Sequence, residues 1–346
     1  MKKRAVTFSF SLVLLAACLL TGTLFSRSEA ATRSQIQRYK VNSRDGLIYF
    51  KRKDYAKAIN CFQNALKIQP GDAPLHYYLG MAAFNMKDYD LASQELSKVV
   101  VMEKPGSRFY KNAIQCFSNC KKEFNNLKPY NCAGTTGKYF RWSKKDEPVK
   151  IFISHGLKLP KGYREKKLNE TQLHNLSGWL KDKKFVSKIR RDSHYDDSFW
   201  EAAKKGIAEW SFAKSENLID FKLVKDPYDA QILVFWCSQA PSKTSAFTNI
   251  PVKEGDRAII QISVEYILGL QAHYRGDTVR YIAAHEFGHA LGLLDSPFER
   301  DIMYPIEKTK VHKTGFHPGG SNKVNQNDEA TLKALYQLPV LGLKKK

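Results

Sequence analysis

The amino-acid sequence predicts two folded regions. The first is an all-α helical-repeat module; the second is an α+β domain with a mixed twisted sheet, a histidine-bearing helix and a closing helix. Three observations support this organisation. Residues 39–72 and 73–106 align with each other at a period of 34. Short segments rich in β-branched and aromatic residues recur after residue 147. A helical segment ending at Gly292 carries two histidines one turn apart.

The composition is that of a folded protein with a strongly basic surface. The 346 residues are enough for two domains that each bury a core. A hydrophobic content of 43% and a charged content of 26% exclude a wholly disordered chain. The net charge is +22, and it remains +19 without residues 1–30, which hold four basic residues and one acidic residue. The basic residues are spread along the chain without an arginine-rich arm, so we interpret them as a solvated surface and expect no nucleic-acid partner.

The first 30 residues have the pattern of an export signal. Lys2, Lys3 and Arg4 precede an apolar stretch that runs to about Phe25, and Ser28-Glu29-Ala30 resembles a cleavage site. We therefore expect an exported protein, secreted or associated with a cell envelope of bacterial type. Two alternatives stay open: a lipid-modified Cys18 in a lipobox-like sequence, and an uncleaved segment that acts as a membrane anchor. A membrane is expected as a partner only through this N-terminal segment.

Five cysteines follow residue 30, namely Cys61, Cys116, Cys120, Cys132 and Cys237. Because five is an odd number, at least one thiol stays free or pairs between chains. The spacing of Cys116, Cys120 and Cys132 lacks the paired rhythm of a zinc knuckle, which favours buried thiols or one bridge.

The repeat has matched small and bulky positions. Gly46 matches Gly80, Phe50 matches Phe84, Ala58 matches Ala92, and Phe62 matches Leu96. Small alanines let paired helices approach, and the bulky Phe62 and Leu96 fill the space between neighbouring pairs. Residues 31–125 therefore resemble tetratricopeptide (TPR) repeats. This resemblance implies a surface that binds a protein substrate or partner, although a spacer role is an equal alternative.

The repeat module is expected to depend on the rest of the chain for its stability. Residues 107–124 are expected to form a capping helix that uses Phe109, Ile114 and Phe117. Two repeats and a cap are short for an independent solenoid, which normally needs three units. We therefore expect the module to pack against the remainder of the protein. Residues 126–146 have the composition of a linker.

The second half alternates predicted strands and helices. Strands are expected at residues 149–154, 219–224, 230–236 and 258–263, and helices at 171–181 and 198–215. Residues 158–191 are rich in lysine and are interpreted as a surface insertion. This order of elements predicts an α+β domain.

The strongest chemical signal is the helix that begins near Asp277-Thr278 and stops at Gly292. His285 and His289 are four residues apart, so both imidazoles leave one helix face and can hold one metal ion. Glu286 is rotated by roughly 100° from His285, so it need not bind the metal and can reach a water molecule beside it. The turn at Gly292 brings Asp295 back as a third ligand, which gives the open four-coordinate zinc of hydrolytic sites.

The full segment reads HEFGHALGLLD and is followed by DIMYP at residues 301–305. This pattern resembles the metzincin zinc peptidases, and most closely the matrixins, with their HExxHxxGxx(H/D) helix and turn and their later methionine turn. Asn327 to Tyr336 resembles the closing helix of that family. The resemblance implies a matrixin-like zinc metallopeptidase domain at residues 147–340, with a basic tail at 341–346.

The resemblance implies a role for each motif residue. His285, His289 and Asp295 would bind one catalytic zinc ion, and Glu286 would activate the zinc-bound water as general base. Met303 would form the floor under the metal, and Tyr304 and Pro305 would begin the wall of a substrate pocket. A peptide substrate would pair with an edge strand, for which residues 258–263 are the candidate.

The sequence departs from the family pattern in three ways. Asp295 stands where most matrixins have histidine, so His312 or His317 is an alternative third ligand. The family's structural zinc and calcium sites have no clear counterpart, which leaves a need for calcium open. The usual cysteine switch is absent; Cys132 could cap the zinc as a thiolate, but a bridged or buried Cys132 is favoured.

Two functions of different classes follow. The first is an exported endopeptidase whose repeats select or position a protein substrate. The second is a catalytically inactive adaptor, in which the zinc fold survives as a scaffold and the repeats bind a partner. Peptide-bond cleavage that depends on Glu286 discriminates between them.

Overall fold

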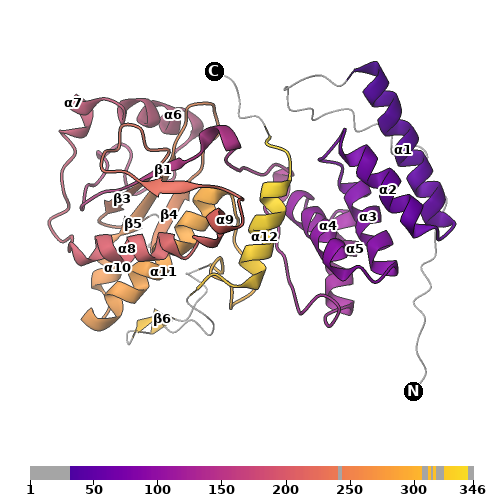
Figure 1. The fold of residues 1–346 in the computed structure, drawn as a ribbon. Helices are drawn as coiled ribbons and strands as arrows, with labels where there is room; N and C mark the ends of the chain where they lie inside the picture. The colour runs from indigo at the N-terminus through magenta and orange to yellow at the C-terminus, as the bar shows by residue number, and fades with distance from the viewer. Residues whose placement is uncertain (1–31, 241–243, 306–310, 313–314, 317–322, 342–346) are drawn as a thin grey trace. The chain divides into compact units, whose positions relative to one another are not determined.

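The computed structural model describes residues 32–240, 244–305, 311–312, 315–316 and 323–341 (Figure 1). The predicted signal segment 1–30, His317, the side chain of His312 and nearly all of the tail 341–346 lie outside the described residues. None of the helices within the described ranges has the length and apolar character needed to cross a bilayer.

Residues 33–119 form five helices, which confirms the repeat prediction. They are α1 (Arg33–Lys51), α2 (Tyr55–Leu66), α3 (Ala73–Asn85), α4 (Tyr89–Met102) and α5 (Arg108–Asn119). The matched glycines allow helices to approach within each pair. A Cβ built on Gly46 would lie 2.6 Å from the Phe62 ring, and one on Gly80 would lie 2.9 Å from Leu96 Cγ. The small and bulky positions of the repeat are therefore complementary surfaces of one helix pair.

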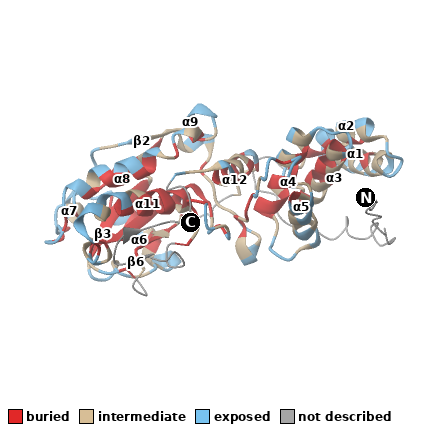
Figure 2. Ribbon diagram, turned by 90° about the horizontal axis from the view of Figure 1, so that it is seen from below, coloured by how far each residue is buried: buried red, intermediate tan, exposed pale blue. Residues whose placement is uncertain are grey.

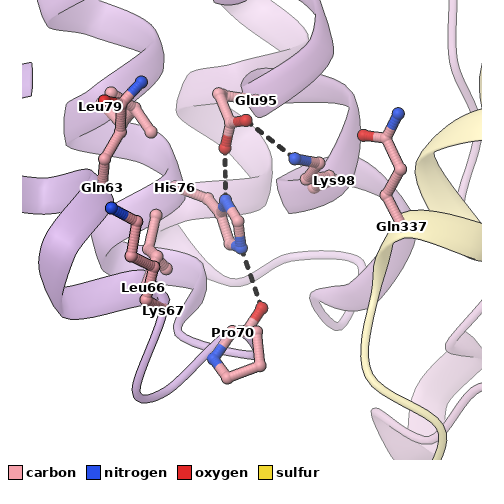
Figure 3. A pocket seen from close by; sticks show the side chains of 9 residues that line it. All are labelled: Gln63, Leu66, Lys67, Pro70, His76, Leu79, Glu95, Lys98 and Gln337. Atoms are coloured by element: carbon pink, nitrogen blue, oxygen red, sulfur yellow. Dashed lines mark hydrogen bonds and ion pairs between the residues drawn. The ribbon is translucent and has the colours of Figure 1, made fainter.

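A hollow of about 340 Å³ is lined by residues of the repeats, among them His76, and by Gln337 from the C-terminal half. Figure 3 shows the side chains that line it. The buried His76 ring contacts the Glu95 carboxylate through Nδ1 and the Pro70 carbonyl oxygen, at 3.0 Å, through Nε2. Lys98 Nζ donates to the other Glu95 oxygen at 2.7 Å. These contacts satisfy the buried His76 and Glu95 side chains and link α3 and α4 to the turn at Pro70.

The repeats pack on the closing helix α12 (Gln326–Gln337), as the shortness of the repeat array predicts. Helix α4 contacts α12, and Val101 and Met102 share one core with Leu332 and Leu335. Pro339, just after α12, lies against Gly71 in the loop between α2 and α3. The second half of the chain thus supplies the neighbour that the second repeat lacks.

The segment with linker composition, residues 126–146, is packed rather than free. Tyr130 and Cys132 are at most 2% exposed. The Tyr130 hydroxyl donates to Asp328 Oδ1 at 2.9 Å, and Trp142 Nε1 donates to the carbonyl oxygen of Ala290 at 2.9 Å. Residues 126–146 are therefore a packed part of the fold as well as the connection between its two halves. Asparagine, glycine and proline here serve tight turns against α11 and α12, and the buried aromatic residues anchor the segment.

The second half is built on a five-stranded mixed sheet, which confirms the predicted fold class. The strands are β1 (Val149–Ile153), β2 (Phe221–Leu223), β3 (Ile232–Cys237), β4 (Ala246–Asn249) and β5 (Ala258–Ser263). Their order in the sheet is β2-β1-β3-β5-β4, with β4 alone antiparallel. Two further strands of two residues each, β6 (Val311–His312) and β7 (Gly315–Phe316), pair with each other in a separate antiparallel sheet.

The predicted substrate strand is not at an edge. Residues 258–263 form β5, which pairs with β3 on one side and with β4 on the other. The edges are β2 and β4, and β4 contacts α11 (Ala272–Leu291), the helix with the histidines. The prediction was wrong because β4 is only four residues long and has no β-branched run to reveal it.

One face of the sheet is covered by α11 and α8 (Ser198–Ala208), with the short α9 (Phe212–Ser215) beyond α8. Figure 2 shows α11 buried along much of its length. Helix α8 approaches α11 closely because Gly206 faces its backbone: a Cβ there would lie 2.2 Å from the Arg280 carbonyl oxygen. The histidine-bearing helix is therefore held between a second helix and the sheet.

The lysine-rich residues 158–191 cover the opposite face of the sheet. They contain α6 (Glu170–Trp179) and α7 (Lys183–Val186). Leucines of this segment, including Leu159 and Leu176, pack on Phe152 and Phe235 as a second core. The segment is thus a structural layer with a basic outer side, and the interpretation as a surface insertion was wrong.

Two predicted helix boundaries differ from the structure. The helix expected at 198–215 ends at Ala208, and a turn leads into α9. Helix α11 begins at Ala272 rather than near Asp277, after the short α10 (Val264–Leu268). Arg275 donates to the carbonyl oxygens of Leu268 and Leu270 at 3.0 Å, which holds the extra turn in place.

Candidate metal centre and active site

Helix α11 and the turn after it position the motif. Gly292 adopts a left-handed conformation with φ of 107°, and its N–H donates to His289 O at 2.9 Å. The Leu293 N–H donates to Gly288 O at 3.0 Å. These bonds close the helix end and reverse the chain, as the sequence predicted for Gly292. The reversal carries Asp295 back towards the two histidines.

The three predicted ligands converge. Asp295 Oδ1 lies 3.6 Å from His285 Nε2 and 3.4 Å from His289 Nε2. One donor atom from each residue fits within a mutual distance of 4.8 Å. The His285 side chain is 5% exposed and the Asp295 side chain is 56% exposed. The cluster is therefore buried on the helix side and open to solvent on the carboxylate side.

In each imidazole the Nδ1 atom, which is the ring nitrogen not directed at Asp295, forms a hydrogen bond with a backbone carbonyl group. His285 Nδ1 lies 2.9 Å from the Ile302 carbonyl oxygen, and His289 Nδ1 lies 2.9 Å from the Leu293 carbonyl oxygen. A carbonyl oxygen can only accept, so each Nδ1 carries a hydrogen and donates it. In the neutral rings the lone pair is then on Nε2, the atom that faces Asp295. This arrangement is the one in which protein histidines bind metal ions.

The local electrostatics favour a cation at this point. Burial lowers the pKa of His285 to about 3, and the neighbouring His289 adds to this effect, so the His285 ring is neutral. Burial also acts to lower the pKa of His289, but the hydrogen bond to Asp295 and the charges of Glu286 and Asp295 outweigh it and raise this pKa to about 9. The carboxylates of Glu286 and Asp295 thus favour a positive charge beside the two imidazoles.

Glu286 lies on the same helix, is 4% exposed and is directed towards strand β4. Its Oε2 atom is 2.6 Å from Thr248 Oγ1. Nothing in the sequence singled out Thr248, because a lone threonine in an unpredicted four-residue strand carries no motif. The contact joins the predicted general base to the edge of the sheet.

Met303 lies under the helix turn that carries the histidines. It is fully buried, and a Cβ on Gly288 would lie only 2.3 Å from its sulfur atom. Its carbonyl oxygen accepts from the Ser296 N–H at 2.7 Å, which links the methionine turn to the residue after Asp295. The Ile302 N–H donates to Asp328 Oδ2 at 3.1 Å. The methionine turn therefore contacts both the loop that carries Asp295 and helix α12.

Tyr304 and Pro305 continue from this turn. Tyr304 is half-buried, and its carbonyl oxygen lies 3.4 Å from the Tyr281 hydroxyl on α11. Pro305 is buried. The next five residues lie outside the described part of the chain, so a pocket wall at this position stays a prediction.

The cysteines take no part in the cluster. All five described cysteines are free thiols. Cys132 is 2% exposed, and burial raises its pKa to about 12, so it is a neutral thiol. Within the described residues, the donor cluster contains His285, His289 and Asp295 and does not include Cys132. The favoured prediction was buried thiols or one bridge: Cys132 and Cys237 are buried thiols, whereas Cys61, Cys116 and Cys120 are partly exposed thiols, and the five described cysteines form no bridge.

Replacement of Gly292 tests the turn that delivers Asp295. A Cβ at this position would lie 2.0 Å from the carbonyl oxygen of Phe140, and the left-handed φ strains any other residue. Gly292→Ala is expected to lower the free energy of unfolding by about 2 to 4 kcal/mol, measured by urea denaturation. Gly178→Ala is the matched control, since a Cβ at Gly178 meets nothing within 4 Å. A Gly292→Ala protein as stable as the control would contradict this account of the turn.

Comparison with known proteins gives matches in both halves. The family profile "TPR repeat" matches residues 46–87. A 53-residue stretch is 38% identical to a TPR repeat-containing protein of Schizosaccharomyces pombe, over 15% of this chain and 6% of that protein. A 63-residue stretch is 41% identical to matrix metalloproteinase-19 of Homo sapiens, over 18% of this chain and 11% of that protein. The chain thus aligns with only a small part of either relative.

The matrixin profile matches residues 144–337, which is more than half of the chain. This range contains the five-stranded sheet, α11, the methionine turn and α12. Family membership implies a zinc ion, and the donor cluster of two imidazoles and a carboxylate has the composition of a catalytic zinc site. The chain belongs to the matrixin family of metalloendopeptidases and carries an N-terminal TPR repeat region.

Proposed function

We propose that this chain is an exported zinc endopeptidase that binds zinc through His285, His289 and Asp295 and uses Glu286 as its general base. The observation that carries the proposal is the convergence of three donor atoms within 4.8 Å. Both imidazoles are fixed from behind by backbone carbonyl groups, which fits a site built for a metal ion. Zinc bound there would polarise the scissile carbonyl group and lower the pKa of a water molecule.

Glu286 is the proton carrier in this proposal. Its carboxylate takes a proton from the attacking water while the water oxygen bonds to the carbonyl carbon of the substrate. The same carboxyl group then gives the proton to the amine nitrogen as the carbon–nitrogen bond breaks. Burial of Glu286 beside the donor cluster supports this role, because a group on the next helix position lies close to the ligands without competing for them.

The substrate is proposed to be an extended peptide that pairs with β4. This strand is an edge of the sheet, so one side of its backbone is available for pairing, and it lies beside α11. The half-exposed Asp295 supports access from solvent on this side of the cluster. Met303 is proposed as the floor of the site, and Tyr304 and Pro305 as the start of the pocket wall.

The repeats are proposed to recruit or position a protein substrate or partner. Their firm packing on α12 supports a fixed geometry between the recruiting surface and the site. Export is proposed from the N-terminal segment, with Cys18 modification or a retained anchor as the alternatives.

The test is cleavage of a proteome-derived peptide library by the purified mature chain. We expect cleavage to stop after zinc is removed with a chelator and to return when zinc is restored. Mass spectrometry of the new termini identifies the bonds cut. One zinc ion per chain without hydrolysis of any peptide or unfolded protein would reject the proposal and favour the adaptor.

A further inference from the structure

Thr248 belongs to the face of β4 that looks at the active-site helix. Side chains alternate along a strand, so Ala246 and Thr248 share one face and Phe247 and Asn249 share the other. Ala246 joins the core that contains α11. Phe247 packs with Cys237 and Ala240, away from that core. The register of β4 against β5, with Thr248 opposite Ile260, therefore directs the threonine hydroxyl towards α11.

The hydroxyl contacts Glu286 twice. Thr248 Oγ1 lies 2.6 Å from the carboxylate oxygen Oε2 and 3.1 Å from the backbone carbonyl oxygen of the same residue. A hydroxyl has one hydrogen, so it donates to one of these oxygens at a time. The shorter distance identifies the carboxylate as the acceptor while Glu286 is ionised, since charge-assisted bonds are the shorter and stronger ones.

We propose that Thr248 is the positioning residue for the general base, an inference that rests on the proposed function of Glu286. The Glu286 carboxylate is buried, so it forms few hydrogen bonds with solvent. The hydrogen bond from Thr248 then fixes the rotamer of the Glu286 side chain. Thr248 sits on the strand proposed to pair with the substrate. One strand would thus set the position of both the base and the scissile bond, which keeps the two in register.

The same hydroxyl serves Glu286 before and after proton transfer. It donates to the carboxylate while Glu286 waits for the proton of the attacking water. The proton of the attacking water goes to the other carboxylate oxygen, Oε1, and Oε2 then remains an acceptor for the Thr248 hydroxyl, with a neutral bond in place of the charge-assisted one. The carboxyl group is then held in place until the proton passes to the amine nitrogen. A side chain without a hydroxyl can do neither.

The test compares Thr248→Val, which keeps the shape and removes the hydroxyl, with Thr248→Ser, which keeps the hydroxyl. We expect Thr248→Val to lower kcat by about 10- to 100-fold while KM changes by less than about twofold. Thr248→Ser is expected to restore most of kcat. Each protein should retain one zinc ion and the wild-type melting temperature.

Thr278→Val is the matched control. Thr278 is a buried threonine of α11 whose hydroxyl has no hydrogen-bond partner among the described residues. Its replacement should leave kcat unchanged. A Thr248→Val protein with wild-type kcat, or a Thr248→Ser protein as slow as Thr248→Val, would overturn the positioning role.

Crystal structures of the zinc-free variants provide a measurement that does not depend on activity. We expect Glu286 Oε2 within hydrogen-bond distance of residue 248 in the wild type and in Thr248→Ser, and a displaced carboxylate in Thr248→Val. An unmoved carboxylate in Thr248→Val would overturn the inference. If the carboxylate moves but the wild type and Glu286→Gln hydrolyse peptides equally slowly, the positioning stands and the proposed function of Glu286 fails.

Discussion

Glu286→Gln is expected to lower kcat/KM for peptide hydrolysis by about 10³-fold, because a positioned general base contributes about 10² to 10⁴ in rate. The amide oxygen can still accept from Thr248 Oγ1, so the side chain should keep its place beside β4. The amide cannot take up the proton of the attacking water. The loss should therefore appear in kcat, measured with the best peptide from the library, while zinc content stays at one ion per chain.

Glu201→Gln is the control for this experiment, because Glu201 is an exposed glutamate of α8 with a side chain that is 59% exposed. It makes the same chemical change away from the donor cluster and should leave kcat/KM at the wild-type value. Retention of more than about a tenth of the activity by Glu286→Gln would remove Glu286 from the role of general base.

Asp295→Ala is expected to weaken zinc binding by more than about 10²-fold, since even the loss of a group that only orients a ligand costs about 10- to 100-fold in metal affinity. Asp295 is half-exposed, so its removal should cost the metal-free fold little. Equilibrium dialysis against buffered zinc measures the affinity, and thermal unfolding of the metal-free protein measures the fold. Asp295→His should recover zinc binding, because an imidazole can supply the third donor.

Asp229→Ala is the control, because Asp229 is an exposed aspartate, with a side chain that is 82% exposed, and it does not belong to the donor cluster. Unchanged zinc affinity in Asp295→Ala would show that another group completes the site, and His312 or His317 would then be the next candidates for substitution.

The sequence predicted those parts of the site that depend on local geometry. His285, Glu286 and His289 are set by helical periodicity, and Asp295 follows from one glycine turn. The contacts that hold these residues in place come from distant parts of the chain. The Ile302 carbonyl that fixes His285 and the Thr248 hydroxyl beside Glu286 become neighbours only after the sheet and the methionine turn have formed. Spacing along the chain carries no signal for such pairs.

The same distinction between local patterns and long-range contacts applies to the fold. Strands with continuous β-branched residues, such as β3 and β5, were evident from composition. Strand β4 was not, because Ala246 to Asn249 gains its extended form from pairing with β5. Residues 126–146 have the amino acids of a connector, yet Tyr130 and Trp142 are buried by helices that lie far away in sequence. The amino-acid composition of such a segment predicts its turns. It does not predict which parts of the fold its aromatic residues contact.

The Asp328 carboxylate sets a lower limit on how small a working protease fragment can be. It accepts from the Tyr130 hydroxyl and from the Ile302 N–H, while the Ile302 carbonyl oxygen accepts from His285. A chain that begins at residue 147 would lack Tyr130. The Asp328 carboxylate would then lose one of its hydrogen-bond donors, close to the backbone of Ile302 that holds His285. The shortest intact peptidase unit therefore starts upstream of Tyr130, well before the first strand of its sheet.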